Sequence, residues 1–450
     1  MKKATTHFLV LLSLIFPGRL GAQESKPPEA RHITVDQAVQ LALKHNHVVR
    51  IAGYSVQEKE HGKEIARSAY FPILRNDSMV AHVTDTQFIG IPVGGLGTIA
   101  GTLLPQQSIV LNQGGHTLIT SGTSLTQPLS DLWKVKSAND VAAAELREKQ
   151  SKARQTENEI ALRVHQLYYR ILVLQSHKEA AAAKIQANEA LQAERLQQVK
   201  FGSSLEEEAI ESRAQSLQAN QDLLTTELQL SDLTMQLDDA IGLPLNTPLT
   251  LDPTVRQVAN TCEREQCLQT AMDSHPEIAE ARAKVEQASA ATRLAKRQYV
   301  PDVEAFARYS YQDQVPFLVH NFGTFGMHLG YDLFDGGRRK AAIAERKALL
   351  AQAEENLARV KEEVELRVQT AYNKLERTRQ MMKVSEQLLT LRTESRRVYV
   401  QQLQEGSALR SQVAAAEANE LEAKTLLLQS QLEYIQANDE MTEAIGQTPE

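Results

Sequence analysis

Few residues of this chain are spaced for chemistry. His45 and His47 are two positions apart, and on a helix two such side chains diverge, so a shared metal ion is not expected. Gly94-Gly95-x-Gly97 has the glycines of a phosphate-binding loop, but no helix start with Lys followed by Ser or Thr comes after it. The sequence also lacks Gly-x-Ser-x-Gly, His-Glu-x-x-His and paired Cys-x-x-Cys motifs. It therefore predicts no enzyme, no cofactor and no metal site.

The two cysteines, Cys262 and Cys267, are five positions apart. On one helix they would point to different sides, which argues against a bond between them. In an oxidising compartment they would instead form a local disulfide that staples a loop. The sequence leaves both outcomes open.

The first 22 residues have the pattern of an export signal. Lys2 and Lys3 precede an apolar stretch from Phe8 to Phe16, and small residues follow up to Ala22, where cleavage is expected. The apolar stretch is too short to cross a bilayer, which takes roughly 20 helical residues, and no later segment approaches that length. The formal charge of −7 argues against nucleic acid as a partner.

The rest of the chain contains an internal duplication. A shift of 204 positions aligns 127–242 with 331–446 without a gap, so that Gly202 and Ser203 recur as Gly406 and Ser407. Upstream the shift is 229, which leaves 25 extra residues in the first copy. They fall in the Gly- and Pro-containing stretch 88–107, which is expected to be a flexible loop.

These boundaries predict four parts of the chain. They are a signal peptide at 1–22, a first repeat at 23–244, a linker at 245–263 and a second repeat at 264–450. Each repeat is predicted to run helix, strand, loop, strand, long helix, turn, helix. The predicted helices are 35–70, 130–200 and 205–241 in the first copy, and 264–299, 335–404 and 409–445 in the second.

The long helices would measure about 105 Å, and the two shorter helices of each copy, stacked end to end, would match that length. Apolar residues such as Leu217, Leu224 and Leu228 follow the steps of a coiled-coil seam. The predicted class is therefore mainly α, with long helical hairpins. A solid antiparallel bundle is the alternative, but it leaves the export signal and the interposed strands unexplained.

Four strands interrupt the helices. They are expected at about 74–88, 116–127, 302–313 and 324–334, where apolar and polar residues alternate. About ten residues per strand suits a tilted membrane crossing. Four strands cannot close a barrel, and open edges are not tolerated in lipid, so several chains would have to pool their strands. The alternative is an ordinary periplasmic hairpin on a helical domain.

The stretch Asp335-Gly336-Gly337-Arg338-Arg339 lies where the last strand meets a long helix. Asp335 is predicted to accept hydrogen bonds from the free N–H groups of the helix start, and the glycines to permit the tight bend. Arginines oppose the helix dipole there. Arg338 and Arg339 are therefore expected to meet lipid phosphates or a neighbouring chain, with two solvated side chains as the alternative.

Leu333-Phe334-Asp335-Gly336-Gly337-Arg338, joined to the duplicated layout and the Gly-Ser turns, resembles the TolC family of outer-membrane efflux and secretion channels over essentially the whole mature chain. The resemblance implies a homotrimer in outer-membrane lipid, with a twelve-stranded β-barrel and a hollow periplasmic α-barrel. It implies a passive exit duct for tripartite efflux or type I secretion, with a periplasmic adaptor and an inner-membrane pump as partners. The opposing function is a periplasmic coiled-coil scaffold without a pore.

The resemblance places the two helix-hairpin turns at the periplasmic mouth, where the adaptor docks. The docking residues it implies are Phe201, Gly202, Ser203, Leu205, Gly406, Ser407 and Leu409. Purely structural turns are the alternative reading of these residues.

Next to the turns lie Glu206, Glu207, Glu208 and Arg410, which are candidates for an acidic gate that Arg410 would hold shut. Many family members have Asp after the second turn, where this chain has Gln412 and Ala415, which puts the usual gate in doubt. The alternative is a solvated helix start, where Glu suits the dipole.

Overall fold

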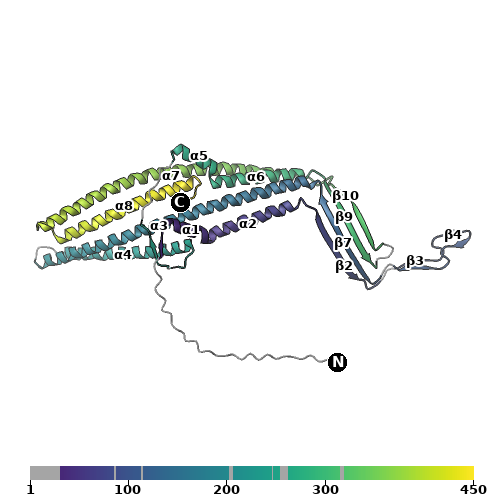
Figure 1. The fold of residues 1–450 in the computed structure, drawn as a ribbon, viewed down its shortest axis with the longest axis horizontal. Helices are drawn as coiled ribbons and strands as arrows, with labels where there is room; N and C mark the ends of the chain where they lie inside the picture. The colour runs from purple at the N-terminus through teal and green to yellow at the C-terminus, as the bar shows by residue number, and fades with distance from the viewer. Residues whose placement is uncertain are drawn as a thin grey trace, which may run out of the picture.

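The structure is a computed structural model that describes residues 31–85, 88–112, 115–201, 206–245, 247–253, 262–314 and 319–449. Two long helical hairpins extend from one end of a four-stranded sheet, as Figure 1 shows. The prediction of a mainly α chain with two repeats and a smaller set of membrane-type strands is confirmed. None of the helices in the described ranges has the length and apolar character of a membrane span.

The helices repeat in the same order in both halves of the chain. The first half contains α1 (Val35–His45), α2 (His47–Ser68), α3 (Asp131–Lys200) and α4 (Glu206–Ile241). The second contains α5 (Arg264–Ser274), α6 (Pro276–Arg297), α7 (Arg338–Gln404) and α8 (Arg410–Ala444). The two long helices, α3 with 70 residues and α7 with 67, each pair with a shorter helix at the far end of the molecule.

The single helices predicted at 35–70 and 264–299 are wrong, because each is two helices. The breaks fall at Asn46 and His275, which are equivalent under the shift of 229 and have the same extended backbone, with ψ of 130° and 129°. Asn46 accepts a hydrogen bond from the N–H of Val48, and His275 accepts one from Glu277. Each break therefore begins a new, capped helix. His275 also precedes Pro276, which disfavours the helical conformation at that position.

Four antiparallel strands form the main sheet in the order β10-β9-β7-β2. They are β2 (Ile73–His82), β7 (Thr117–Pro128), β9 (Asp302–Asp313) and β10 (Asn321–Gly330). The central pair, β7 and β9, joins the two repeats. Among the described strands, the outer strands β2 and β10 each have a partner on one side only.

Two of the predicted strand ranges differ from the observed ones. The first strand ends at His82 rather than 88, because the N–H of Val83 bonds to the carbonyl of His116 and closes the hairpin there. The last strand begins at Asn321 and ends at Gly330 rather than 334. Its partner β9 begins at Asp302, opposite Gly330, so among the described residues no strand pairs with those that follow Gly330.

Next to the helices, the sheet has one apolar and one polar face. One row of neighbours across the four strands is Phe325, Ala307, Leu125 and Leu74, and the adjacent row, on the opposite face, is Thr324, Arg308, Ser124 and Arg75. Side chains alternate between faces along each strand. In these rows one face is therefore suited to lipid and the other to water. Farther from the helices the first face also carries Asn76, Ser78 and Ser121, which hydrogen-bond to one another.

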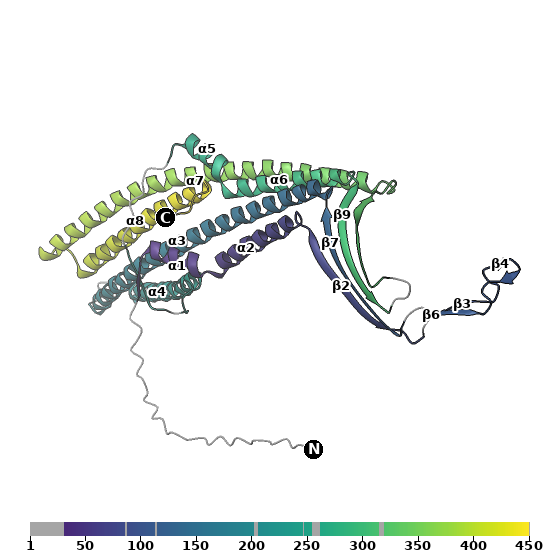
Figure 2. The ribbon, with the colours of Figure 1, turned by 45° about the vertical axis from the view of Figure 1, so that its right-hand side comes forward.

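The insertion in the first repeat contains paired strands, whereas a loop was predicted. It contains β3 (Phe88–Ile91), β4 (Thr98–Ile99), β5 (Thr102–Leu103) and β6 (Ile109–Asn112), with β3 paired to β6 and β4 to β5. We refer to residues 88–112 as the extension. Figures 1 and 2 show that it projects beyond the end of the main sheet that lies away from the helices.

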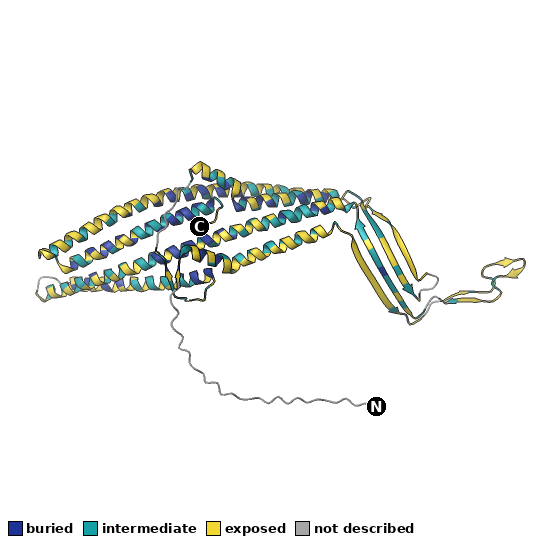
Figure 3. Cartoon of the chain, viewed as in Figure 1, coloured by how far each residue is buried: buried dark blue, intermediate teal, exposed yellow. Residues whose placement is uncertain are grey.

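The main core lies midway along the helices. Short strands β1 (Arg31–Ile33) and β8 (Leu249–Leu251) pair in parallel beside α3. The hydroxyl of Tyr168 on α3 donates to the carbonyl of Ile33 and accepts from the N–H of Asp252. Burial raises the pKa of Tyr168 to about 12. Figure 3 shows buried residues, in dark blue, around these strands and also along α6, α7 and α8, where a second buried cluster lies.

A disulfide joins Cys262 and Cys267, whose Cα atoms are 5.5 Å apart. The objection that both would lie on one helix does not apply, because α5 begins at Arg264 and Cys262 precedes it. The bond therefore staples the end of the linker to the first turn of α5.

Candidate functional site

The second strand-to-helix junction is built by Asp335, Gly336 and Gly337. Asp335 accepts hydrogen bonds from the N–H of Gly337 (3.0 Å) and of Arg339 (3.1 Å), as a capping carboxylate does. Gly336 and Gly337 have φ of 64° and 88°, in the left-handed region that favours glycine. The predicted roles of these three residues are consistent with this geometry.

Arg339 lies in a different place from the one predicted. Its side chain is only 7% exposed and pairs with the carboxylate of Asp335 at 2.6 Å. Its guanidinium also lies 5.0 Å from the ring centres of both Tyr299 and Tyr331. It therefore stabilises the bend from within, and an expected contact with lipid or a neighbouring chain is wrong for this residue.

Arg338 remains exposed and forms an ion pair with Asp332 at 3.2 Å. The charge-assisted hydrogen bond from the Arg339 side chain lowers the pKa of Asp335 to about 2. Asp335 is therefore ionised at every physiological pH, and the junction does not act as a proton switch in that range.

The first junction has no glycines. The N–H groups of Leu129 and Ser130 bond to the carbonyl of Val303 on β9, and the hydroxyl of Ser130 accepts from the N–H of Val303. Lys134 forms ion pairs with Asp131 and Asp302. This junction is therefore stabilised mainly by the second repeat.

The second hairpin turn, between α7 and α8, is fully described. Gly406 has a φ of 74°, and the N–H groups of Ser407 and Ala408 both bond to the carbonyl of Gln402. Leu409 is about half exposed at the start of α8. In the first turn only Phe201 is described, and it is 85% exposed, whereas Gly202, Ser203 and Leu205 lie outside the described residues. The described turn residues are thus presented at the very end of the helical hairpins.

Glu206, Glu207 and Glu208 occupy the first turn of α4 and are exposed. Glu208 pairs with Arg195 of α3 in the same hairpin at 2.9 Å. Arg410 is exposed at the start of α8, and the structure records no ion pair between it and these glutamates among the described residues. Within one chain the structure therefore does not bring the predicted gate residues together.

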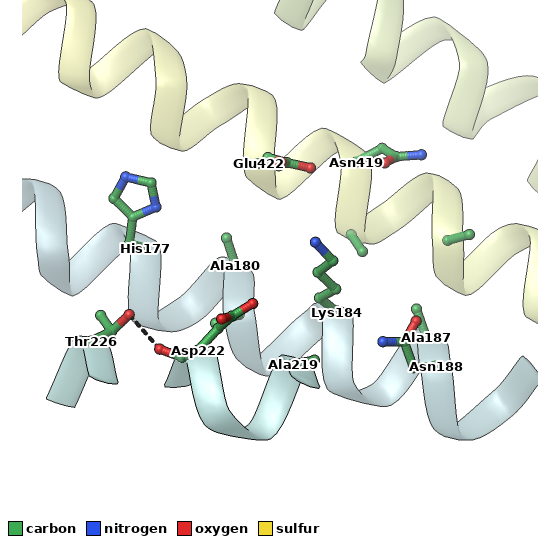
Figure 4. A pocket seen from close by; sticks show the side chains of 13 residues that line it. His177, Ala180, Lys184, Ala187, Asn188, Ala219, Asp222, Thr226, Asn419 and Glu422 are labelled. Atoms are coloured by element: carbon green, nitrogen blue, oxygen red, sulfur yellow. Dashed lines mark hydrogen bonds between the residues drawn. The ribbon is translucent and has the colours of Figure 1, made fainter. Parts of the chain in front are cut away.

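Nearer the middle of the hairpins, a groove of about 290 Å³ lies along α3 between α4 and α8, shown in Figure 4. Alanines of α3, among them Ala180 and Ala187, form its floor. Lys184, Asp222 and Glu422 lie around it, one from each of the three helices. The groove exists because small residues on α3 lie opposite α8.

Two polar clusters were not anticipated from the sequence. His165 of α3 and Asp439 of α8 are fully buried and 2.6 Å apart, which links the two repeats. Glu277 of α6 accepts two hydrogen bonds from Arg367 of α7. Neither pair has a local signature, because each partner comes from a different, distant helix. The described residues contain no group of His, Cys, Asp and Glu that would hold a metal ion.

Comparisons with known proteins agree with this architecture. Residues 267–447 match the family model described as outer membrane efflux protein. No curated protein sequence matches the chain significantly.

Three solved structures illustrate the likeness of the whole fold. The outer membrane protein VceC of Vibrio cholerae is 15% identical, with a TM-score of 0.72 over 92% of this chain and 97% of that one. The CmeC outer membrane channel of Campylobacter jejuni is 14% identical, with a TM-score of 0.73 over 92% and 85%. The MtrE outer membrane channel of Neisseria gonorrhoeae, in an open state, is 15% identical, with a TM-score of 0.71 over 92% and 89%. The second repeat thus carries the outer membrane efflux protein domain, and the whole chain has the fold of the TolC-family outer-membrane channels.

Proposed function

We propose that this chain is one protomer of a trimeric outer-membrane duct, through which an inner-membrane pump and a periplasmic adaptor export their substrate. Three four-stranded sheets would close a twelve-stranded barrel, and three sets of helices would enclose a periplasmic tunnel. The pump and adaptor would belong to a tripartite efflux or a type I secretion system. The family of the second repeat supports it, and so does an asymmetry between equivalent helices.

That asymmetry is between α2 and α6, which are equivalent under the duplication and have the same length of 22 residues. α6 packs against both α3 and α7 and buries seven residues, including Ile278, Ala283 and Ala290. α2 packs against α3 and α1, and none of its residues, all of which the structure describes, is buried. By the symmetry of the repeats, the missing neighbour of α2 is the α7 of another copy. This is the observation that carries the proposal.

Near the hairpin turns, two helices likewise have an apolar surface that no neighbour within the described chain covers. α4 and α7 each carry a row of exposed apolar residues with the seven-residue and three- or four-residue steps of a coiled-coil seam. The row on α4 is Ile210, Leu217, Leu224 and Leu228, and the row on α7 is Val398, Leu391, Val384 and Met381. Counted from its own turn, each residue of the α4 row is about as far along the helix as the matching residue of the α7 row. If α4 of one copy packed antiparallel to α7 of another, the two rows would therefore face each other.

The sheet supports the same assembly. Among the described strands, the edge strands β2 and β10 have one unpaired side each, and exposed apolar residues such as Leu74, Leu125 and Phe325 on one face of the sheet are suited to lipid. Unpaired backbone groups are not tolerated in hydrocarbon, so these edges must be paired by other copies before the sheet enters a bilayer. The β2 edge of one chain and the β10 edge of the next would close the wall.

The hairpin turns are proposed as the adaptor-docking end. Phe201 is 85% exposed, and Leu409 is half exposed beside the left-handed Gly406. Exposed apolar side chains at the extreme end of two rigid hairpins suit packing against another helical turn. In this proposal Glu206, Glu207, Glu208 and Arg410 form charged rings at the same mouth once three copies assemble.

Engineered cysteines on the two seams test the assembly. Leu217→Cys combined with Leu391→Cys should give a covalent trimer under mild oxidation in outer-membrane fractions, because the residues face each other across the α4–α7 seam. The matched control pairs Leu217→Cys with Glu386→Cys, which lies on another side of α7 and should not crosslink. Purified wild-type protein should also conduct in planar bilayers. A water-soluble monomer without conductance would overturn the proposal and favour a scaffold.

Docking is tested separately by Phe201→Asp. We expect export to fall at least tenfold, because a charge replaces the exposed apolar contact, while the Leu217–Leu391 crosslink and bilayer conductance persist. Leu196→Asp, on the same hairpin but inside α3, is the control for a general effect of a new charge. Unchanged export by the Phe201 variant would remove the docking role of this turn.

A further inference from the structure

The extension, residues 88–112, is an apolar structure without charge. No Asp, Glu, Lys, Arg or His occurs from 86 to 115, a stretch bounded by Asp85 and His116. Exposed apolar side chains run along its whole length. They are Phe88, Ile89, Val93, Leu96, Ile99, Leu103, Ile109 and Val110. The second repeat has no counterpart, since these residues make up most of the 25-residue insertion.

The β3–β6 ribbon at the base of the extension is apolar on both faces. Phe88 and Val110 lie on one face, and Ile89 and Ile109 lie on the other. An antiparallel ribbon that packs one face against another part of the protein normally has polar residues on the opposite face, which meets water. A two-stranded ribbon is also marginally stable by itself in water. Apolar side chains on both faces of this ribbon are therefore exposed to water in a single chain. Within its described part, the chain has no element that covers them.

The end of the extension is a defined unit rather than a loose loop. The N–H of Leu96 bonds to the carbonyl of Leu104, and the N–H of Leu104 bonds to the carbonyl of Gly97. The N–H of Gly94 bonds to the carbonyl of Pro105. Leu96 and Ile99 are each 69% exposed on this unit. The apolar surface is thus already shaped before any partner binds, which lowers the entropic cost of packing.

The position of the extension favours another copy of the chain over lipid as its occupant. It projects past the end of the main sheet, whereas the apolar rows suited to lipid lie within the sheet (Figures 1 and 2). The extension follows β2, the edge strand that would adjoin the β10 of the next protomer. A trimer would therefore hold three such extensions close together above the same pore, at a high effective concentration.

From these observations, and resting on the trimer proposed above, we infer that the three extensions of one trimer pack against one another beyond the outer end of the barrel. Each extension buries its apolar faces on the ribbons of the other two copies. The packed extensions cover part of the outer mouth, so that the exit of the duct is narrower than the barrel itself.

Single cysteines test this contact in the full-length protein. Val110→Cys, on the ribbon, and Leu96→Cys, at the tip, are treated separately with a short bis-maleimide in outer-membrane fractions. We expect covalent dimers of the chain from at least one variant. Glu265→Cys, exposed on α5 far from the extension, is the control and should give none. Replacing residues 88–112 by a short Gly-Ser link should raise the single-channel conductance at least twofold.

The outcomes separate this inference from the proposed function. If neither extension cysteine crosslinks while the Leu217–Leu391 pair still gives trimers, the contact between extensions is refuted and the trimer stands. Protection of those cysteines from aqueous maleimide without crosslinking would also refute it, in favour of lipid or a different protein as the cover. Loss of the Leu217–Leu391 crosslink in the same membranes would refute the trimer itself, and with it this inference.

Discussion

The chain turns from a strand into a long helix twice, once after β7 and once after β10, and different contacts stabilise the two turns. After β10 the turn is self-contained: Asp335, two left-handed glycines and Arg339 supply nearly all of its hydrogen bonds. After β7 the turn depends on Val303, which belongs to the other repeat. The duplicated architecture therefore conserves the bend without conserving the interactions that make it. The local turn is expected to be more sensitive to single substitutions.

The largest effect is expected from Arg339→Met. The change leaves the carboxylate of Asp335 without its ion pair and removes the guanidinium from between Tyr299 and Tyr331. The midpoint of thermal unfolding, followed by circular dichroism of protein in detergent, should fall more than for any other variant described here. The matched control is Arg338→Met, because that arginine is exposed and pairs only on the surface. Equal effects of the two substitutions would contradict the buried role of Arg339.

Gly337→Ala tests the backbone of the same turn. No atom lies within 4 Å of the added methyl group, so the cost comes from the φ of 88° alone. A left-handed conformation costs a residue other than glycine about 1–2 kcal/mol, and the free energy of unfolding should fall by that amount. Denaturant titration measures it. Gly53→Ala, inside α2 with open space and no positive φ, is the control and should be neutral or stabilising.

Ser130→Ala tests the turn after β7. The variant loses the hydroxyl that accepts from the N–H of Val303 at 2.7 Å, while two backbone hydrogen bonds to the carbonyl of Val303 remain. A single hydrogen bond contributes about 0.5–1.5 kcal/mol, so the loss should be smaller than that of Gly337→Ala. Denaturant titration of both variants compares them directly. A larger loss for Ser130→Ala would reverse the expected order of the two junctions.

The smallest effect on stability is expected from lowering the pH. The pKa of Asp335 is lowered from 3.8 to about 2 in the folded chain, so its stabilising contribution is complete above pH 4 and is lost as the pH falls through about 2. Asp335→Asn should therefore weaken the pH dependence of the unfolding midpoint between these values. Glu394→Gln is the control for a surface carboxylate whose pKa Arg397 also lowers. An unaltered pH profile for Asp335→Asn would show that the native pair does not form.

The predictions made from sequence succeeded where the signal was local. The long helices, the order of elements in each repeat and the capping role of Asp335 follow from periodicity, from the duplication and from turn chemistry. They failed where contacts between residues far apart in the chain determine the position of a side chain. Arg339 was expected at a lipid or chain interface, but Tyr299, which belongs to the residues before β9, helps to bury it.

The breaks at Asn46 and His275 were missed for a different reason. Each is a single extended residue inside an otherwise continuous apolar pattern, so periodicity did not reveal it. The signals that were present are Asn46 as a helix-capping residue and Pro276 directly after His275. The order within the insertion was missed because its Gly and Pro residues were assigned to a flexible loop.

The sequence by itself determined the duplication, the lengths of the long helices α3 and α7 and the alternation of the strands, because each follows from the spacing of residues along the chain. The export signal stays a prediction, since residues 1–22 lie outside the described ranges. Only the tertiary structure decided that His165 meets Asp439, that Ser130 meets Val303 and that α2 lacks the second neighbour that α6 has. These contacts join residues far apart in the chain. Their presence depends on how packed helices and strands are placed in space, which local residue preferences do not specify.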